Sequence, residues 1–507
     1  MLSVVLVIDL TAGFFEEGNP LYLGRSSRDI IPNVERLLEE EQESGSKIFY
    51  LCDQHLPDDP EFKVFPPHCI AGTRECEVIP ELSSFPGEII PKRHFNGFTR
   101  TSLGDKLEVL GPDKLIICGV WTDICVLHTA AEARTRGYEV EIPSDCVFTP
   151  DRVAQEFALE HMRKIWGIKL TRSPQKIPSP RFKPSPGVIS GETTDIYFAR
   201  TVEILNKEGV NPVATMEVFS GGEGVLCGVS EVQALLKEVL PPGSEVWSLR
   251  EGERFHPQEV VLRIKGPYQS YGMYETTIVG NLAQCSGWTT AAHECVEEAL
   301  GIPIMSFGAR HVHPQVAGIM DYCAVVGGCV GCSSIAGAKL CDLPPMGTMP
   351  HALIITLGST VEAALTFHKH MPEEVPRIAL VDTFKDEAEE SVLVASAMKG
   401  RLEGVRLDTP SERGRVTPSL VKEVRRRLDL AGFGEVKVVV SGGIDPQRIA
   451  YFIQERAPVD MFGVGSYISD AKPIDFTADI HELEGKPIAK RGRIPGVTVS
   501  HRLERVI

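Results

Sequence analysis

Over the first 170 residues, short apolar runs alternate with longer stretches in which apolar residues recur every three or four positions. The short runs predict buried strands, and the periodic stretches predict helices that pack on one apolar face. Expected strands occupy residues 4–8, 47–51, 88–90, 115–119 and 139–142, and expected helices occupy residues 29–42, 123–136 and 151–165. This alternation is typical of a parallel sheet flanked by helices.

A proline-rich stretch separates this pattern from the rest of the chain. Residues 171–187 contain five prolines and four basic residues but no acidic residue, a composition that favours an extended linker. We therefore expect an α/β domain over residues 1–170 and a second unit over residues 188–507. Within the second unit we expect a smaller α+β part (188–300), a barrel part (301–470) and a C-terminal tail (471–507).

The alternation resumes from Pro303 onward. Expected strands occupy residues 352–356, 378–381, 404–407, 436–440 and 461–464, and each precedes a loop that carries Gly, Asp, Ser or His. Functional groups after successive parallel strands are typical of a TIM-like (β/α) barrel. The predicted fold class is therefore α/β, with a parallel-sheet domain first and a TIM-like barrel with a smaller α+β domain second.

Composition excludes some classes of function. The 52 Lys and Arg residues against 69 Asp and Glu give a net charge of −17, which disfavours nonspecific binding to nucleic acid or to an anionic membrane. No apolar run reaches the roughly 18–20 residues of a membrane span. The first residues lack the features of a secretory signal, so the thirteen cysteines fit free thiols in a reducing, cytoplasmic setting.

Three reactive residues stand at the ends of predicted strands in the first domain: Asp9, Lys92 and Cys125. A thiol at the start of a helix and near a lysine is expected to have its pKa lowered toward the thiolate. An aspartate can accept the thiol proton and return it later, and amides at the helix start can bind an oxyanion. Taken singly, the three residues are also compatible with a cap, a surface lysine and a packing cysteine.

Together these residues resemble the cysteine hydrolase superfamily of isochorismatases and nicotinamidases. The resemblance covers residues 1–167 and rests on Asp9 with Phe14, on the segment 92–98 (KRHFNGF) and on residues 119–126 (GVWTDICV). Since isochorismatases lack the catalytic cysteine, Cys125 indicates the amidase branch. The resemblance implies that Cys125 is the nucleophile, that Asp9 moves its proton, that Lys92 stabilises negative charge and that Phe14 lies at the substrate.

Two positions depart from the family pattern. Leu-Thr-Ala-Gly follows Asp9 where Met-Gln-Asn-Asp is common, and Trp121 stands where a small residue is usual. The resemblance implies that the peptide between Val120 and Trp121 is cis and that amides at Trp121 and Cys125 form the oxyanion hole. Trp121 is expected to reshape the pocket.

A second group of residues suggests a metal site in the same domain. Asp53-Gln-His55, followed by Pro-Pro-His68, supplies one carboxylate and two imidazoles, which suit Zn²⁺, Fe²⁺ or Mn²⁺ with open positions. The set resembles the nicotinamidase site, in which the metal binds the pyridine nitrogen. The neighbouring Cys52, Cys69 and Cys76 are expected to pack rather than to bind metal.

Two glycine-bearing strand ends in the second unit have the composition of anion sites. Gly442 and Gly443 follow one apolar run, and Gly463 and Gly465 belong to the next. Bare amides at such positions can cradle a phosphate. Their place late in a barrel-like chain matches the phosphate site expected after strands 7 and 8.

Charged residues end two further strands of the expected barrel. Asp382 and Asp408 stand where a carboxylate can accept ribose hydroxyl groups or reach Mg²⁺. Arg406 lies two residues before Asp408 and supplies a positive charge. These residues and the glycine loops together predict a site for a phosphorylated sugar.

Residues from about 190 to 495 resemble nicotinate phosphoribosyltransferase, a type II phosphoribosyltransferase, through several motifs in family order. Thr194-Asp-Ile-Tyr197 matches a motif whose tyrosine reaches the nicotinate ring, often across a dimer interface, and residues 275–281 match the helix that builds this interface. Ser306-Phe307-Gly-Ala-Arg310 matches a motif whose phenylalanine stacks on the pyridine and whose arginine pairs with a carboxylate or phosphate. His311 stands where the family often has a second Arg, and its role stays open.

The same resemblance bears on substrate and energy source. Relatives that use nicotinamide carry Asp in the Gly331-Cys-Ser-Ser motif, whereas Ser333 stands here as in relatives that use nicotinate. The absent anion favours nicotinate, which is the product implied for the first domain. Gly347-Thr-Met-Pro-His351 matches a motif whose histidine is phosphorylated by ATP.

The sequence therefore predicts a bifunctional enzyme of NAD salvage. Nicotinamide would become nicotinate, and phosphoribosyl pyrophosphate (PRPP) with Mg²⁺ and ATP would convert nicotinate to nicotinate mononucleotide, in an oligomer that is at least dimeric. Two alternatives stay open: the first domain hydrolyses another small amide, or it is a non-catalytic docking module. Metal identity, oligomer number, obligate use of ATP and channelling of nicotinate are not determined by the sequence.

Overall fold

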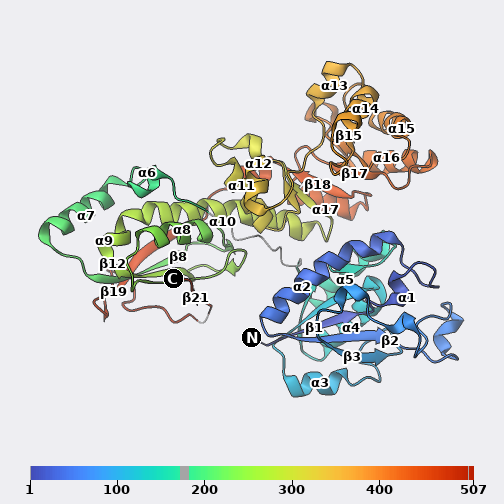
Figure 1. Cartoon of the computed structure of the whole chain (residues 1–507), viewed down its shortest axis with the longest axis horizontal. Helices are drawn as coiled ribbons and strands as arrows, with labels where there is room; N and C mark the ends of the chain where they lie inside the picture. Colours follow the sequence, from blue (N-terminus) through green and yellow to red (C-terminus); the bar gives the residue numbers. More distant parts are fainter. Residues whose placement is uncertain (1, 172–181, 501) are drawn as a thin grey trace. The chain divides into compact units, whose positions relative to one another are not determined.

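A computed structural model describes residues 2–171, 182–500 and 502–507. The chain divides into two compact units, Met1–Lys176 and Ile177–Ile507 (Figure 1). The expected linker falls largely on residues 172–181, which lie outside the described residues. Among the helices that are described, none combines the length and the apolar character needed to cross a membrane.

The first unit is built on a parallel sheet in the order β3-β2-β1-β4-β5-β7, with β6 paired to β4. The strands are β1 (Ser3–Ile8), β2 (Lys47–Asp53), β3 (Glu88–Lys92), β4 (Lys114–Val120), β5 (Glu139–Pro143), β6 (Val147–Phe148) and β7 (Lys169–Thr171). The helices are α1 (Ala12–Phe15), α2 (Ile31–Glu43), α3 (Leu103–Leu110), α4 (Leu127–Thr135) and α5 (Arg152–Trp166). The predicted parallel-sheet fold is confirmed.

Alternation along the buried central strand β1 explains the two layers of helices. Successive side chains of a strand point to opposite faces, and Val5 and Val7 belong to a core with α1 and α2. Val4, Leu6 and Ile8 belong to a second core with α3, α4 and α5. All six residues of β1 are buried, so this strand reads as a continuous apolar run, as expected for a sheet covered on both faces.

The smaller part of the second unit is an antiparallel sheet in the order β20-β19-β8-β12-β10-β21. Its strands are β8 (Val213–Ser220), β10 (Glu245–Ser248), β12 (Val260–Pro267), β19 (Phe476–Leu483), β20 (Lys486–Pro487) and β21 (Glu504–Arg505), and β9 (Gly224–Val225) pairs with β11 (Arg254–Phe255). Its helices are α6 (Pro186–Ile189), α7 (Ile196–Glu208), α8 (Val229–Val239), α9 (Tyr268–Tyr271) and α10 (Glu275–Glu298). The segment expected as a tail thus returns to the smaller part, because β19 pairs with β8.

The other part of the unit is a parallel sheet in the order β14-β13-β18-β17-β16-β15. Its strands are β13 (Ile304–Ser306), β14 (Gly331–Cys332), β15 (Ile378–Leu380), β16 (Gly404–Leu407), β17 (Lys437–Val440) and β18 (Met461–Val464). Its helices are α11 (Ala317–Val326), α12 (Ile335–Cys341), α13 (His351–Leu357), α14 (Thr360–His370), α15 (Glu387–Met398), α16 (Pro418–Leu430), α17 (Pro446–Gln454) and α18 (Ser466–Ser469). The predicted (β/α) architecture is confirmed as an open half-barrel, because the described strands β14 and β15 do not pair with each other.

One predicted strand of this part is wrong. Residues 352–356 lie within helix α13, which begins after Pro350 and ends at Gly358 in the left-handed region (φ 77°). A run of four apolar residues and a threonine fits a strand and a short helix equally well. The proline before the run and the glycine after it are typical helix boundaries, and they decide the outcome.

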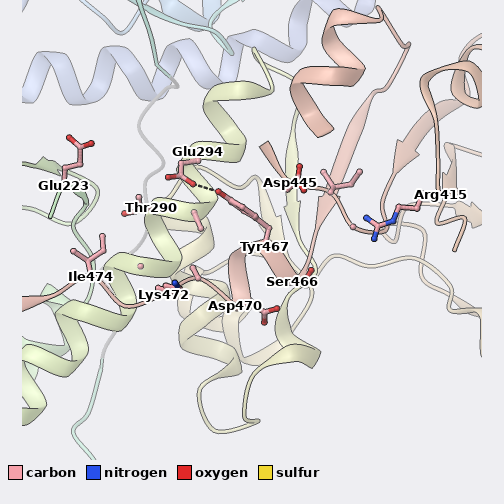
Figure 2. Close-up of a pocket in the computed structure, with 15 residues that line it drawn as sticks. Glu223, Thr290, Glu294, Arg415, Asp445, Ser466, Tyr467, Asp470, Lys472 and Ile474 are labelled. Carbon is pink, nitrogen blue, oxygen red and sulfur yellow. Dashed lines mark hydrogen bonds between the residues drawn. The ribbon is translucent and has the colours of Figure 1, made fainter. Parts of the chain in front are cut away.

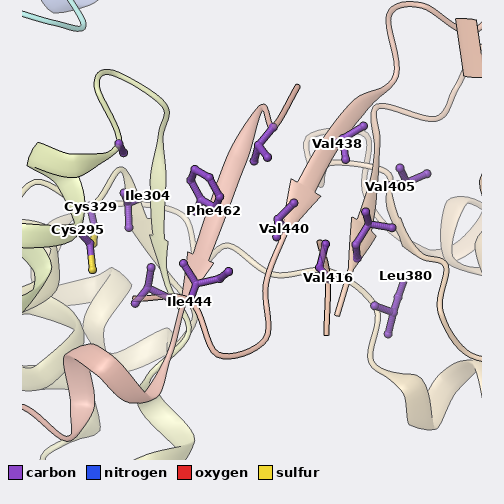
Figure 3. Packing of buried hydrophobic residues seen from close by; sticks show 14 of the residues in the cluster. Cys295, Ile304, Cys329, Leu380, Val405, Val416, Val438, Val440, Ile444 and Phe462 are labelled. Carbon is purple, nitrogen blue, oxygen red and sulfur yellow. The ribbon is translucent and has the colours of Figure 1, made fainter. Parts of the chain in front are cut away.

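Helix α10 connects the two parts of the second unit. It contacts α8, β9 and β19 of the smaller part and α11, α17 and α18 of the half-barrel (Figure 1). The half-barrel is filled by apolar side chains such as Phe462, Val440 and Val438, which lie along β18 and β17 (Figure 3). This packing fixes the strand ends that carry the predicted phosphate loops.

Candidate active sites

The carboxyl ends of parallel strands bring three charged residues to one edge of the first sheet. β2 ends at Asp53 and β3 ends at Lys92, and these two residues are register partners. Asp9 follows the last residue of β1, which pairs with β2. Cys125 reaches the same edge from the helical turn Thr122–Val126 after β4.

The Lys92 ammonium group lies at the centre of this cluster. Its Nζ is 2.7 Å from Asp9 Oδ2, 2.5 Å from Asp53 Oδ1 and 3.6 Å from Cys125 Sγ. Reactive atoms of Asp9, Asp53 and Cys125 all lie within 4.8 Å of one another. The four residues are at most 5% exposed, so the predicted Cys–Lys–Asp set is assembled and closed to bulk water.

Burial sets the protonation of these groups. It raises the pKa of the Cys125 thiol well above its usual range, and Lys92 only partly opposes this effect. The expectation of a lowered thiol pKa is therefore wrong for the free protein, because the sequence pattern revealed the lysine but not the loss of solvent. Burial, aided by Asp53, also raises the pKa of Asp9 to about 7, which suits a group that exchanges a proton with a thiol.

The residues predicted to bind a metal form a second cluster beside the first. Asp53 Oδ2 lies 3.7 Å from His55 Nε2 and 3.9 Å from His68 Nε2. His55 is fully buried, and its Nε2 has no hydrogen-bond partner among the described residues. A buried imidazole nitrogen directed at a carboxylate and a second imidazole is the donor set that Zn²⁺, Fe²⁺ and Mn²⁺ prefer, so these residues fit a metal ion.

Two acidic residues of this cluster were missed by the sequence analysis. Glu61 Oε1 lies 4.0 Å from His55 Nε2 and 3.9 Å from His68 Nε2, so it offers a fourth ligand atom. Asp59 Oδ2 lies 3.2 Å from His55 Nδ1, on the other side of the ring. Both occur in the loop Asp58-Asp-Pro-Glu61 between the predicted ligands, and this local run of acids was the available signal.

Aromatic rings surround the metal cluster. Phe14 is buried with its ring centroid 5.9 Å from that of His68, and Phe65 lies 6.5 Å from His68 and 6.1 Å from Phe95. The peptide Val120–Trp121 is cis, as the sequence resemblance implied. Trp121 is half-buried and packs against the core that contains Phe14.

In the second unit, acidic residues at the ends of β15 and β16 meet the loop that follows β17. Asp382 Oδ2 accepts a hydrogen bond from the Asp408 backbone N–H at 3.0 Å, and Asp408 Oδ1 accepts one from Ser441 Oγ at 3.1 Å. A Cβ added at Gly442 would lie 2.7 Å from Asp408 Oδ1. The predicted carboxylates and the first glycine loop thus lie together, and Gly442 is needed there because of this close approach.

Phe307 and Arg406 lie next to this acidic group. The Arg406 guanidinium is 5.8 Å from the centroid of the Phe307 ring, and its Nη2 is 3.6 Å from Asp408 Oδ2. The Phe307 ring fills the space that a side chain at Gly463 would need. Burial lowers the pKa of Arg406, and its Nε has no hydrogen-bond partner within the described part of the chain.

His351 is joined to the same group through Asp382. Its Nε2 lies 2.9 Å from Asp382 Oδ1, and its side chain is 41% exposed. Burial raises the pKa of Asp382, although His351 opposes this effect. A Cβ added at Gly465 would lie 3.4 Å from Phe307 O and 3.7 Å from His311 Nε2, so His311 borders the site.

Three other residues predicted for this site are exposed to solvent. Arg310 is exposed but close enough to Arg406 to lower its pKa. Ser333 is exposed in the loop after β14, and the next residue, Ser334, is anchored by its backbone N–H to the buried Asp321 carboxylate at 2.9 Å. Tyr197 is exposed on α7 and belongs to the smaller part of the unit.

Family models match almost the whole described chain. Residues 3–173 match the isochorismatase domain. Residues 195–286 match the N-terminal domain of quinolinate phosphoribosyl transferase, and residues 289–479 match its C-terminal domain.

Individual relatives match one unit or the other. Nicotinate phosphoribosyltransferase pncB2 of Mycobacterium tuberculosis (strain ATCC 25618 / H37Rv) is 28% identical over 247 residues, which are 48% of this chain and 52% of that protein. The uncharacterized isochorismatase family protein PncA of Bacillus subtilis (strain 168) is 28% identical over 188 residues, which are 34% of this chain and 99% of that protein. The chain spans about half the length of the curated phosphoribosyltransferases it matches.

A solved structure also matches the second unit. The nicotinate-nucleotide pyrophosphorylase from Pyrococcus furiosus is 45% identical and covers 62% of this chain and 81% of its own, with a TM-score of 0.58. The order of the domains and these relatives together decide the family. The chain belongs to the isochorismatase family through residues 3–173 and to the quinolinate phosphoribosyltransferase family through residues 195–286 and 289–479.

Proposed function

We propose that this chain converts nicotinamide to nicotinate in its first unit and nicotinate to nicotinate mononucleotide in its second. The observation that carries the proposal is the buried Cys125–Lys92–Asp9 set beside a metal-type cluster, in one chain with a phosphoribosyltransferase half. A hydrolase that releases a pyridine carboxylate supplies the substrate that such a transferase consumes. This is a role in NAD salvage.

The first reaction is amide hydrolysis through a thioester. Asp9 takes the proton of the Cys125 thiol as the sulfur attacks the carboxamide carbon, and it passes this proton to the leaving ammonia. Lys92, whose pKa is held well above its usual range by Asp53 and Asp9 against the opposing effect of burial, stabilises the negative charge. Backbone amides at Trp121 and Cys125 serve as the oxyanion hole, and water then hydrolyses the thioester.

Asp53, His55 and His68, with Glu61, are the residues that would hold a divalent transition metal. When bound, it supplies a Lewis acid for the pyridine nitrogen and so selects a heteroaromatic amide. The rings of Phe14 and Phe65 supply apolar walls beside this cluster. With a metal held there, these walls would keep the pyridine ring of the substrate beside Asp53, His55 and His68.

The second reaction needs no protein nucleophile for the glycosyl transfer. Phe307 stacks on the pyridine ring, Arg310 pairs with an anionic group of the substrates, and Arg406 offers its unpaired Nε to the nicotinate carboxylate. Asp382 and Asp408 bind ribose hydroxyls and the Mg²⁺ that accompanies pyrophosphate. The glycine loops at Gly442, Gly443, Gly463 and Gly465 receive phosphate oxygens.

ATP use rests on His351. Its Nε2 is turned to Asp382, which leaves Nδ1 as the nitrogen that accepts the γ-phosphoryl group of ATP. The bond from phosphorus to the ADP oxygen breaks as the bond to Nδ1 forms, and Asp382 stabilises the positive imidazole. Hydrolysis of this phosphohistidine would then drive the transfer forward.

A homo-oligomer of at least two chains completes the transferase site. Tyr197 lies on α7 of the smaller part and does not take part in the Phe307–Arg406 group of its own chain. Ile196, Tyr197 and Ile204 are 57–60% exposed on this helix. A second copy that covers this face would bring Tyr197 to a neighbouring nicotinate site, while Ser333 leaves that site without a repelling anion.

One assay tests the proposal. Purified protein receives nicotinamide, PRPP, Mg²⁺ and ATP, and ammonia and nicotinate mononucleotide are followed by chromatography. We expect both products in equal amounts. Product from added nicotinate but not from nicotinamide would leave only the second half of the proposal, and release of ammonia only from other small amides would reassign the first unit.

Two control substrates decide the remaining alternatives. Quinolinate in place of nicotinate tests whether the transferase follows the description of its family model, and carbon dioxide release with mononucleotide formation would favour quinolinate. Omission of ATP measures how far the transfer depends on it. A first unit that releases no ammonia from any amide would be a docking module.

A further inference from the structure

Two adjacent glycines of the β17 loop face groups of opposite charge. Gly442 touches the Asp408 carboxylate, whereas a Cβ added at Gly443 would overlap the guanidinium of Arg415. Both glycines have positive φ, at 87° and 64°. The loop therefore has an acidic side, which continues to Asp382 and His351, and a basic side at Arg415.

The backbone directs Arg415 to this position. Arg415 itself has a left-handed conformation (φ 63°), which is uncommon for a residue other than glycine. Its backbone N–H donates to Pro410 O at 3.1 Å, and the Arg448 guanidinium donates to the next carbonyl, Val416 O, at 2.7 Å. The turn is thus held by two hydrogen bonds, and it presents the guanidinium to the bare Gly443 backbone.

The Arg415 guanidinium has an unused binding capacity. Within the described residues it forms no hydrogen bond and no ion pair, and it is close enough to Arg448 to lower the pKa of that residue further, beyond the effect of burial. Asp445 opposes this effect at Arg448, but the exposed Arg415 has no acidic partner of its own among the described residues. An anion at Arg415 would relieve the repulsion between the two guanidinium groups.

Open space lies beside this guanidinium. Arg415 and Gly443 line one end of a cavity of about 610 Å³, and Glu223 and Ile474 lie at the other end (Figure 2). Ser466, in the turn that follows β18, also lines it. The cavity is large enough for a phosphate group and its water. Its lining is mixed: Arg415 and Lys472 are cationic, and Glu223, Glu294, Asp445 and Asp470 are acidic.

We propose that Arg415, together with the amide of Gly443, binds the 5′-phosphate of the phosphoribosyl donor. The inference rests on the proposed transferase function and assigns a substrate contact that the sequence motifs did not supply. The assignment follows from the difference between the acidic groups beside Gly442 and the guanidinium beside Gly443. The diphosphate end of PRPP travels with Mg²⁺ and suits the acidic side at Asp382 and Asp408, whereas the 5′-phosphate is a bare dianion and suits a guanidinium with five donors.

Steady-state kinetics of Arg415→Gln test this assignment. Loss of a charge-assisted contact should raise the KM for PRPP by about 10-fold to 100-fold, with the KM for nicotinate within about twofold of the parent. Arg426→Gln is the matched control, because Arg426 is exposed on α16 and makes no hydrogen bond or ion pair with the described residues. Circular dichroism and a melting curve check that both variants fold.

Two inhibitors separate the ends of the donor. Ribose 5-phosphate carries only the 5′-phosphate, and pyrophosphate carries only the diphosphate. Arg415→Gln should weaken inhibition by ribose 5-phosphate by the same factor as the KM for PRPP, and inhibition by pyrophosphate should not change. An unchanged KM, an equal loss in Arg426→Gln, or a selective loss of pyrophosphate inhibition would each overturn the assignment.

This failure differs from failure of the proposed function. If the second unit is not a phosphoribosyltransferase, the parent protein forms no mononucleotide from any pyridine carboxylate. If only the Arg415 assignment fails, the parent protein is active and its variant keeps the parent KM for PRPP. Arg415→Lys keeps the charge but loses the planar fork, so its KM should lie between those of the parent and Arg415→Gln.

Discussion

The two units place charge in opposite ways. In the first unit the reactive groups are almost completely buried, and Lys92 pairs with both Asp9 and Asp53 before any substrate arrives. In the second unit Arg406 and Arg415 keep donors without partners in the described chain, and His351 is 41% exposed. The first site thus pairs its lysine within the chain, whereas the second keeps cationic donors for ligands that carry negative charge.

The difference follows from the proposed substrates. Nicotinamide is small and neutral, so a closed site can admit it without a large electrostatic change, and a dry site strengthens each polar contact. PRPP brings several negative charges and leaves some of them behind as pyrophosphate. A site for such a donor has to hold cations apart from acids until the donor binds, which glycine loops and half-exposed side chains permit.

The largest effect should come from a substitution that removes the nucleophile of the closed site. Cys125→Ala should reduce ammonia release by about 10⁴-fold or more, because no other group can form the thioester. Transferase activity with added nicotinate should not change, since Cys125 belongs to the first unit. Separate assays of ammonia and of mononucleotide measure the two effects.

Cys76→Ala is the matched control. Cys76 is also buried in the first unit, and its Sγ donates to Ile70 O at 3.2 Å rather than joining the Lys92 cluster. It should keep most of the hydrolase activity. Ammonia release by Cys125→Ala at the parent rate would contradict the nucleophile assignment, and an equal loss in Cys76→Ala would point to packing.

The second prediction concerns the buried charges themselves. Lys92→Met leaves Asp9 and Asp53 buried without their common partner, so the first unit should lose about 3–5 kcal/mol of stability. Arg406→Met in the open site should cost much less, because its ion pair with Asp408 is long and its Nε is unpaired. Hydrogen exchange of the β1 and β4 amides reports on the first unit separately.

Equal destabilisation of the two units by these substitutions would contradict this prediction. The pairing of Lys92 with two carboxylates would then have no greater structural role than the long Arg406–Asp408 pair. Loss of nicotinate affinity in Arg406→Met, without loss of stability, would support the contrast between the two sites. It would show that the open site holds its charge for the ligand.

The sequence predicted the residues at strand ends better than it predicted burial or the direction of loop side chains. Strand ends at Asp9, Asp53 and Lys92 could be located because apolar runs stop there, and parallel topology then brings them together. The sequence could not reveal the raised pKa of Cys125, since burial depends on packing from several distant segments. Glu61 and Asp59 were missed because a loop has no periodicity that assigns its side chains a direction.

The second unit shows the same limit in another form. The glycine loops and Asp408 were found from strand ends. Arg415 lies in a loop turn, where Gly414 indicates a left-handed residue but nothing indicates that Arg415 after it is left-handed too or where its side chain points. The helical residues 352–356 were predicted as a strand because a run of four apolar residues and a threonine is too short to show a period. Strand β19 returns to the smaller sheet by pairing residues more than 250 positions apart in the sequence, such as Phe476 and Ser220. No local sequence pattern predicts a pairing over that separation.

The third prediction, of a smaller effect, concerns the carboxylate of Asp59 and its contribution to metal binding in the first unit. Asp59→Asn removes the carboxylate at His55 Nδ1 and should lower the affinity for Zn²⁺ by about 10-fold to 100-fold, because outer carboxylates orient a ligating imidazole. Titration of the metal-free protein with Zn²⁺ against a competing chelator measures this. Asp58→Asn is the control, since Asp58 is exposed one residue earlier, and equal losses would assign the effect to net charge alone.

The smallest effect concerns a half-buried acid, Glu231, which has no lysine partner of the kind that Lys92 provides in the first unit. Burial, aided by Glu251, raises the pKa of Glu231 on α8 to about 7. A carboxyl group whose folded pKa exceeds its unfolded value favours unfolding once it ionises, so its contribution improves as the pH falls from about 7 toward 4.5. The expected change is about 2 kcal/mol in the second unit, and Glu231→Gln should remove it.

Hydrogen exchange of the α8 and β8 amides at pH 5 and pH 8 measures the stability of Glu231→Gln and of the parent. The difference between the two proteins gives the contribution of Glu231 ionisation to the free energy of unfolding. The variant should gain on the parent as the pH rises, whereas Glu238→Gln, exposed on the same helix, should follow the parent at both values. A parent that is as stable at pH 8 as the variant would mean that Glu231 is compensated in the folded chain. The Glu231 carboxylate would then be stabilised by a partner in the folded chain. The two units would differ only in their sites, which are closed in the first unit and open in the second.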